Sequence, residues 1–220
     1  MTSKKKWRPP NPTTPSVSSR HPLRAVAIIT VILSLAIVGY ASKSFSPSRT
    51  STKAVEYAIG TPSSGALAPD FSLPSTNGAT VNLVDFRGKT VLLFFHEGIG
   101  CQPCWDQIRD LQSAQSALRN AGVDELLTIT SGPIRLIAQK MADDRLTAIA
   151  LGDTNLEISK KYQANQFGMM GDSRDGHSFI LVGPDGRINW RADYGGPPKY
   201  TMYVPVTKIL SDMKSGRATA

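Results

Sequence analysis

Apolar residues follow two patterns along this chain. Ala25–Ser42 is an uncharged run of 18 residues dominated by Leu and β-branched side chains, whereas from Ala66 onward short apolar runs alternate with turn-forming residues. A helix of that length spans about 27 Å, close to the ~30 Å of bilayer hydrocarbon. The run is apolar on every side and predicts a transmembrane helix over 25–42. A cleavable signal peptide is the alternative, because Gly39-Tyr40-Ala41 resembles a cleavage site.

The pattern after Ala66 predicts strands that alternate with helices. Thr90–Phe95 is a continuous apolar run, typical of a strand covered on both faces. Pro103 to about Asn120 carries the stripe of an amphipathic helix, and Gly183-Pro184-Asp185-Gly186 predicts a hairpin turn. We expect further strands at 126–130, 148–151, 178–182 and 187–192, and further helices at 133–141, 155–162 and 203–214. Such an order predicts a mixed α/β sheet with helices on both faces.

The charge distribution refines this picture. The chain has 25 Lys plus Arg and 17 Asp plus Glu, a net charge of +8, but six of the basic residues and no acidic one lie in residues 1–24. Residues 66–214 hold 15 basic and 16 acidic residues, which argues against a basic nucleic-acid-binding domain. By the positive-inside rule, the tail stays in the cytoplasm and the domain lies outside.

The predicted organisation is that of a single-pass membrane protein with a cytoplasmic N-terminus. Its parts are a basic disordered tail over 1–24, the transmembrane helix over 25–42, a flexible linker over 43–65 rich in Ser, Thr, Gly and Pro, an extracytoplasmic domain over 66–214 and a C-terminal tail over 215–220.

The chain has two cysteines, Cys101 and Cys104, where a predicted strand ends and a predicted helix begins. The free N–H groups and the dipole at a helix start lower a thiol's pKa, so Cys101 can be a nucleophilic thiolate. Cys104, one turn on, can resolve a mixed disulfide, and Pro103 fits the first turn, where N–H groups lack intrahelical partners. A zinc site would need further ligands. A loop this short constrains the unfolded chain little, which favours a redox pair over a static disulfide.

A set of short motifs covers nearly all of 66–214. Its members are Ala68-Pro69-Asp70-Phe71, Leu73, Asn77-Gly78, Val81, Leu83, Asp85-Phe86-Arg87-Gly88-Lys89, Phe94-Phe95, the Cys-x-Pro-Cys, and Phe179-Ile180-Leu181-Val182 with Pro184-Asp185-Gly186. In order and spacing these motifs resemble the thioredoxin-like superfamily, in its redoxin branch of AhpC/TSA-type peroxiredoxins and TlpA-type membrane-tethered oxidoreductases. The resemblance implies a thioredoxin-like fold with an N-terminal β extension and a βα insertion over 148–162.

Three positions depart from the patterns of these families. A peroxiredoxin site would carry Pro and Thr seven and three residues before its attacking cysteine. This chain has Phe94 and Gly98 there if Cys101 attacks, or Glu97 and Cys101 if Cys104 does. Thioredoxins place a cis-Pro before the strand facing the disulfide, where Gly176-His177 stands here. The aromatic residue usual before the first Cys is Gly100. Thiol peroxidase is therefore the alternative activity.

His177 allows more than one interpretation. Its position before a strand is similar to that in Sco-type copper chaperones, and copper would then bind Cys101, Cys104 and His177. The Cys spacing in that family is one residue wider, so no metal is expected in the leading interpretation. His177 could instead be a general base or proton shuttle beside Cys101, or make a structural hydrogen bond.

His96 and Glu97 precede the first cysteine in a long loop. If folded over the helix start, Glu97 would raise the pKa of Cys101 and protonated His96 would lower it. We expect both at a solvated rim of the site. Met169-Met170, in a Gly-rich segment, could form an adaptable apolar substrate lip or a loop with no role.

The sequence thus predicts an extracytoplasmic thiol-disulfide oxidoreductase, tethered through 25–42. No organic cofactor is needed, because the sulfurs of Cys101 and Cys104 carry the electrons. Protein thiols or disulfides are the expected substrates and no nucleic-acid partner is expected. The resemblance implies a membrane redox partner, either a thiol transporter or a quinone-linked oxidase. The sequence leaves the redox direction open.

Overall fold

The computed structural model describes residues 56–217. The predicted tail, the transmembrane helix, the first part of the linker and residues 218–220 lie outside this range. Within residues 56–217, no helix combines the length and the apolar character needed to cross a bilayer.

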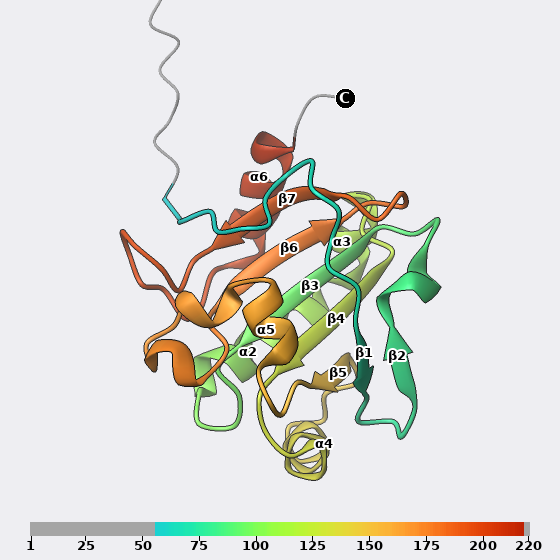
Figure 1. The fold of residues 1–220 in the computed structure, drawn as a ribbon, viewed down its shortest axis with the longest axis vertical. Helices are drawn as coiled ribbons and strands as arrows, with labels where there is room; N and C mark the ends of the chain where they lie inside the picture. The colour runs from blue at the N-terminus through green and yellow to red at the C-terminus, as the bar shows by residue number, and fades with distance from the viewer. Residues whose placement is uncertain (1–55, 218–220) are drawn as a thin grey trace, which may run out of the picture. The chain divides into compact units, whose positions relative to one another are not determined.

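One five-stranded sheet forms the centre of the domain, with strand order β5-β4-β3-β6-β7 (Figure 1). The central strand β3 is parallel to β4 and antiparallel to β6; β5 extends the parallel side and β7 the antiparallel side. The strands are β3 (Val91–His96), β4 (Glu125–Thr130), β5 (Ile149–Gly152), β6 (Ser178–Val182) and β7 (Ile188–Asp193). A separate antiparallel pair, β1 (Ser72–Pro74) and β2 (Thr80–Asn82), forms the predicted N-terminal extension.

Helices cover both faces of the sheet, as the apolar pattern predicts. Leu92 and Phe94 of β3 face a core that includes side chains of α2, α3, α4 and α6. Leu93 and Phe95 point the other way, into a core that includes β1, η1, α5 and η2. The helices are α2 (Gln102–Ser113), α3 (Gln115–Asn120), α4 (Ile134–Asp143), α5 (Glu157–Lys161) and α6 (Val206–Gly216), with 3-10 turns η1 (Leu83–Phe86), η2 (Ala164–Gln166) and η3 (Gly171–Ser173).

The single helix predicted over 103–120 is wrong in one respect, because the structure divides it. Ala114 leaves helical geometry, with φ −94° and ψ 19°, and separates α2 from α3. No Gly or Pro marks this break in the sequence. The predicted C-terminal boundary also moves: α6 continues to Gly216, and Arg217 Nη2 donates to Ala121 O over 2.8 Å.

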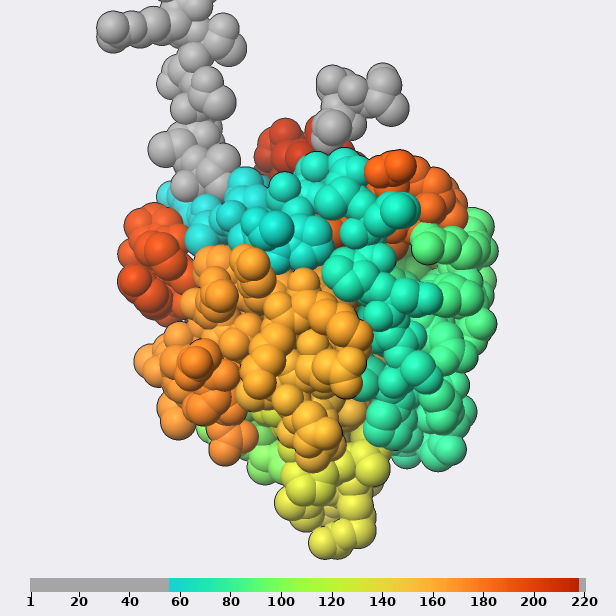
Figure 2. Space-filling view, viewed as in Figure 1, coloured from blue at the N-terminus to red at the C-terminus, as the bar shows by residue number. Residues whose placement is uncertain are grey.

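The predicted linker over 43–65 is too long at its C-terminal end, because residues 56–65 pack on the domain. Ala58 pairs with Asp193 of β7, and Gly65 N donates to Ile188 O over 2.8 Å. The ring of Tyr57 packs against Trp190, and its hydroxyl accepts the indole N–H over 3.2 Å. Figure 2 shows this segment (cyan) lying against the body of the domain. Backbone pairing and the contacts of the Tyr57 ring with Trp190 and Tyr194 thus order a segment whose composition is that of a spacer.

Candidate active site

Cys101 and Cys104 form a disulfide at the start of α2, with an S–S distance of 2.07 Å. Cys101 is the N-cap residue, and its sulfur accepts the backbone N–H of Cys104 over 3.3 Å. Pro103 occupies the first turn of the helix, as predicted. The Cys101 side of the pair is 8% exposed, whereas Cys104 is fully buried and Met202 packs against both. The two sulfurs therefore differ in access: a partner can approach Cys101 before Cys104.

His177 lies against the buried sulfur. Its Nδ1 is 3.9 Å from Sγ of Cys104, so the cysteine that the ring contacts is the second of the pair. The sheet explains the placement: Ser178, the next residue, pairs with Phe95 at the end of β3, just before the loop that leads to the cysteines. Burial, and then the nearby His96 ring, lower the pKa of His177 to about 3. The imidazole is therefore neutral at physiological pH.

His96 is fully buried, which corrects the expectation of a solvated rim. Its ring stacks on Phe94 at 5.3 Å and meets the edge of Trp105 at 5.2 Å, measured between ring centres. Burial lowers the pKa of His96 to about 3. The expectation that a protonated His96 lowers the pKa of Cys101 is therefore also wrong near neutral pH. The neutral ring packs behind α2.

Glu97 is buried as well, which corrects the expectation that its carboxylate faces solvent. Its Oε1 accepts the backbone N–H groups of Met169 and Met170, the latter over 3.3 Å. The following loop is fixed by Trp105, whose indole N–H donates to Gly98 O over 3.1 Å. Glu97 thus connects the loop before Cys101 to the segment around η3.

Asp175 is a buried carboxyl near the site that the sequence analysis does not single out. It lies two residues before His177 and is fully buried. Burial, and then the charge of Asp153, raise its pKa well above the usual range. The carboxylate of Asp153 is hydrogen-bonded to the first turn of α5, where it accepts the N–H groups of Ile158 and Ser159 over 3.2 and 2.8 Å. The topology could have identified both residues. Asp153 follows β5 and Asp175 precedes β6, so both lie at the end of the sheet where β3 leads to the cysteines.

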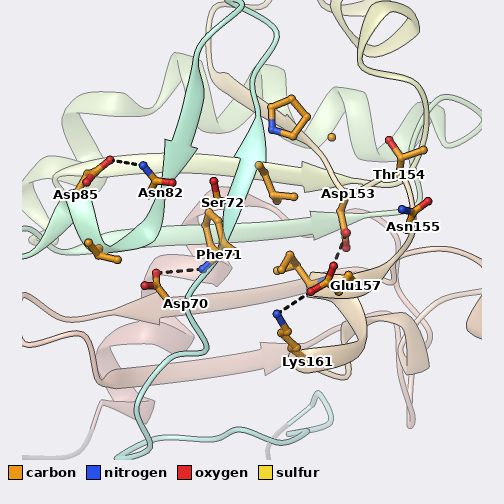
Figure 3. A pocket seen from close by; sticks show the side chains of 15 residues that line it. Asp70, Phe71, Ser72, Asn82, Asp85, Asp153, Thr154, Asn155, Glu157 and Lys161 are labelled. Atoms are coloured by element: carbon orange, nitrogen blue, oxygen red, sulfur yellow. Dashed lines mark hydrogen bonds and ion pairs between the residues drawn. The ribbon is translucent and has the colours of Figure 1, made fainter.

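A cleft of about 650 Å³ lies away from the disulfide, between β1, η1 and the start of α5. Figure 3 shows polar side chains around it, among them Asp70, Asn82 and Glu157, with Glu157 paired to Lys161. None of the residues predicted for the active site lines this cleft. Among residues 56–217, no three His, Cys, Asp or Glu side chains converge as a metal site would require.

The buried histidines make the free energy of unfolding depend on pH. Unfolded histidine takes up a proton below about pH 6.5, whereas His96 and His177 in the folded domain do so only near pH 3. Their contribution is therefore complete above pH 6.5 and is lost as the pH falls through this window, by about 1.4 kcal/mol per pH unit for each ring. Asp175 acts in the opposite direction, because its raised pKa favours the folded state as it becomes protonated.

We expect His96→Gln to flatten this dependence. Removing one titrating ring should lower the slope of unfolding free energy between pH 6 and pH 4.5 by about 1.4 kcal/mol per pH unit, and His177→Gln should do the same. Urea unfolding at several pH values measures the slope. Curves of both variants that run parallel to that of the unmodified chain would show that the rings are not neutral in the folded state.

Comparisons with known proteins identify the family of this chain. Residues 64–191 match the AhpC/TSA family. Peroxiredoxin Bcp of Escherichia coli (strain K12) is 33% identical over 129 residues, which cover 56% of this chain and 81% of Bcp. Thiol-disulfide oxidoreductase ResA of Geobacillus thermodenitrificans (strain NG80-2) is 34% identical over 79 residues, which cover 36% of this chain and 44% of ResA.

A solved structure supports the same fold. Peroxidoxin BcpB from Mycobacterium tuberculosis superposes with a TM-score of 0.57, over 71% of this chain and 99% of that one, at 16% identity. At that identity the likeness establishes the fold alone. The thioredoxin-like fold expected from the motifs is thereby confirmed for the described domain.

Proposed function

The chain belongs to the AhpC/TSA family of redox enzymes, and on that premise we propose that it is a thiol-disulfide oxidoreductase acting outside the cytoplasm through Cys101 and Cys104. The observation that carries the proposal is the disulfide itself, which sits at a helix start with Cys101 8% exposed and Cys104 fully buried. That asymmetry assigns attack to Cys101 and resolution to Cys104. The match to ResA, named as a thiol-disulfide oxidoreductase, supports this choice within the family.

The reaction needs no electron carrier besides the sulfurs. In the reducing direction, the Cys101 thiolate attacks one sulfur of a substrate disulfide, forms a mixed disulfide and expels the first substrate thiolate, which takes up a proton. The Cys104 thiolate then attacks Sγ of Cys101, and the second substrate thiolate leaves and is protonated. Two electrons have passed from the protein to the substrate, and the protein holds the disulfide of the structure. Substrate oxidation is the same sequence in reverse.

His177 is a polar side chain in contact with the sulfur that acts in the second step. Its neutral ring lies at hydrogen-bond distance from the Cys104 sulfur and can accept a hydrogen bond from the reduced thiol. Held this way, the Cys104 thiol keeps its place in a buried site where a lone polar hydrogen would be costly.

Thiol peroxidase is the second candidate, because relatives such as Bcp are named peroxiredoxins. Phe94 and Gly98, which occupy the positions of the peroxiredoxin Pro and Thr before Cys101, argue against this activity. Phe94 is fully buried and stacks on Phe179 at 4.5 Å between ring centres, and Gly98 has no side chain to contact a peroxide. A peroxidase would have to polarise the O–O bond with other groups.

The location outside the cytoplasm is proposed from the sequence. The apolar run 25–42 behind a basic tail gives the orientation, and an oxidising compartment suits a Cys-x-Pro-Cys couple. Cleavage of the domain by a protease added to intact spheroplasts, with the N-terminal tail protected, tests this orientation.

A paired turnover assay tests the activity. The full chain, solubilised in mild detergent, is supplied with dithiothreitol and either insulin or hydrogen peroxide. We expect insulin disulfides to be reduced well above the dithiothreitol background and peroxide to be consumed at the background rate. The opposite result would assign the peroxidase activity instead.

A further inference from the structure

Three large apolar side chains are exposed on the loop before the disulfide and on the segment that Glu97 links to that loop. Ile99, two residues before Cys101, is 38% exposed; Met169 and Met170, between η2 and η3, are 68% and 57% exposed. Figure 1 shows the segment around η3 (orange) beside the loop between β3 and α2 (light green). We call Ile99, Met169 and Met170 the apolar lip. A cluster of exposed apolar side chains on a folded domain marks a binding surface, and methionine adapts to varied partners.

One buried carboxylate joins the two parts of the lip. Glu97 lies in the same loop as Ile99, and its Oε1 accepts the backbone N–H groups of both Met169 and Met170. Hydrogen bonds from two consecutive N–H groups to a carboxylate are charge-assisted and fix the local backbone direction. The position of Met169 and Met170 relative to Cys101 therefore depends on Glu97.

The base of the methionine loop is fitted to this carboxylate. A Cβ added at Gly168 would lie 2.7 Å from Oε1 of Glu97 and 3.0 Å from Cα of Gly176, so a larger residue would displace the contact. The loop is also tied to the active site, because Phe167 O accepts the N–H of His177 over 2.9 Å. The segment that leads into Met169 is thus connected to Glu97, which precedes the cysteines, and to His177, which contacts Cys104.

We propose that Glu97 is a positioning residue that holds Met169 and Met170 beside Cys101, where the lip binds apolar residues flanking a substrate disulfide. The inference rests on the proposed function and adds a substrate preference to it. Polypeptide disulfides with apolar neighbours are favoured over oxidised glutathione, whose groups beside the disulfide are polar and charged. Contact with the lip acts on binding, because the methionine side chains do not take part in the sulfur exchange.

The test uses the full chain, a fixed concentration of dithiothreitol as the electron donor, and three oxidised substrates under saturation kinetics. They are a cyclic peptide whose cystine is flanked by Phe and Leu, the same peptide with Ser at both positions, and oxidised glutathione. Glu97→Ala and the double variant Met169→Ser/Met170→Ser should each raise KM for the Phe/Leu peptide about tenfold, with kcat within about twofold. The values for the Ser peptide and for glutathione should not change.

Two variants serve as matched controls. Glu97→Gln keeps an oxygen that accepts both N–H groups and should retain the preference of the unmodified chain. Leu67→Ser removes an exposed apolar side chain next to Arg187, at the opposite edge of the sheet, and should have no effect. Hydrogen exchange gives an independent readout: the amides of Met169 and Met170 should exchange faster in Glu97→Ala and at the original rate in Glu97→Gln.

Two results would overturn the inference. One is an unchanged KM for the Phe/Leu peptide in the double methionine variant, whose exposed positions leave the fold intact. The other is an equal loss on all three substrates, which would show a general structural effect. If the unmodified chain reduces none of the three and its disulfide form oxidises none of the corresponding dithiols, the proposed function fails, and this outcome is distinct from a lost preference.

Discussion

Replacing Cys101 by Ser should lower disulfide turnover by at least about a thousandfold, because a hydroxyl cannot form the mixed disulfide. The substitution is otherwise mild. Ser is a favoured N-cap residue, and its oxygen can accept the Cys104 N–H that the sulfur accepts now. The loss of activity should therefore come without loss of α2, and circular dichroism of the variant should match that of the unmodified chain.

Cys104→Ser is the matched partner of this experiment. Cys101 remains able to attack, but the buried group that resolves the mixed disulfide is gone, so the substrate should stay attached to Cys101. Mass spectrometry after a single turnover should show one covalent adduct in this variant and none in Cys101→Ser. An adduct on Cys104 in the Cys101→Ser variant would reverse the assigned roles.

Arg191→Met should destabilise the domain by about 3–5 kcal/mol, the cost of leaving one member of a buried ion pair alone. Arg191 and Asp193 both lie in β7 with fully buried side chains, and the guanidinium donates to the two carboxylate oxygens over 2.8 and 3.0 Å. The same pair holds the N-terminal segment, since Asp193 also accepts Gly60 N over 2.6 Å and Arg191 donates to Pro62 O over 2.9 Å. Without Arg191, the Asp193 carboxylate would be buried and unpaired.

Urea unfolding at pH 7 measures this effect. Lys89→Ala is the control, because its ion pair with Glu125 spans a similar distance of 2.9 Å between side chains that are 52% and 33% exposed. An exposed pair contributes about 0–1 kcal/mol, so the control should stay close to the unmodified chain. Equal losses of unfolding free energy in the two variants would mean that the buried pair stabilises the domain no more than the exposed pair does.

Much of the fold follows from local sequence patterns. Continuous apolar runs predict β3 and β6 because a strand covered on both faces cannot alternate, and Gly183–Gly186 predicts the β6–β7 turn. The division at Ala114 and the order of 56–65 escape such patterns. The order of 56–65 depends on contacts between distant segments, such as Asp193 with Gly60, that no local signal reports.

The candidate site is predictable in part. The Cys101–Cys104 spacing and its place between strand and helix predict that the two cysteines lie together and that Pro103 lies in the first turn of the helix, as the structure shows. The burial of His96 and Glu97 is not predictable from a polar loop, because it depends on Trp105 and on Met169 and Met170 from elsewhere in the fold. The contact of His177 with Cys104 requires the β3–β6 register, which places the start of β6 beside the end of β3.

The measurement that tests the central claim most directly is a redox titration of the Cys101–Cys104 couple. The full chain is equilibrated in glutathione or dithiothreitol buffers of known potential, free thiols are alkylated, and the fraction of disulfide is read by mass spectrometry. A catalytic couple should interconvert fully, with a midpoint between about −270 and −120 mV. A disulfide that stays oxidised until the potential falls below about −300 mV would be structural, and would contradict the account.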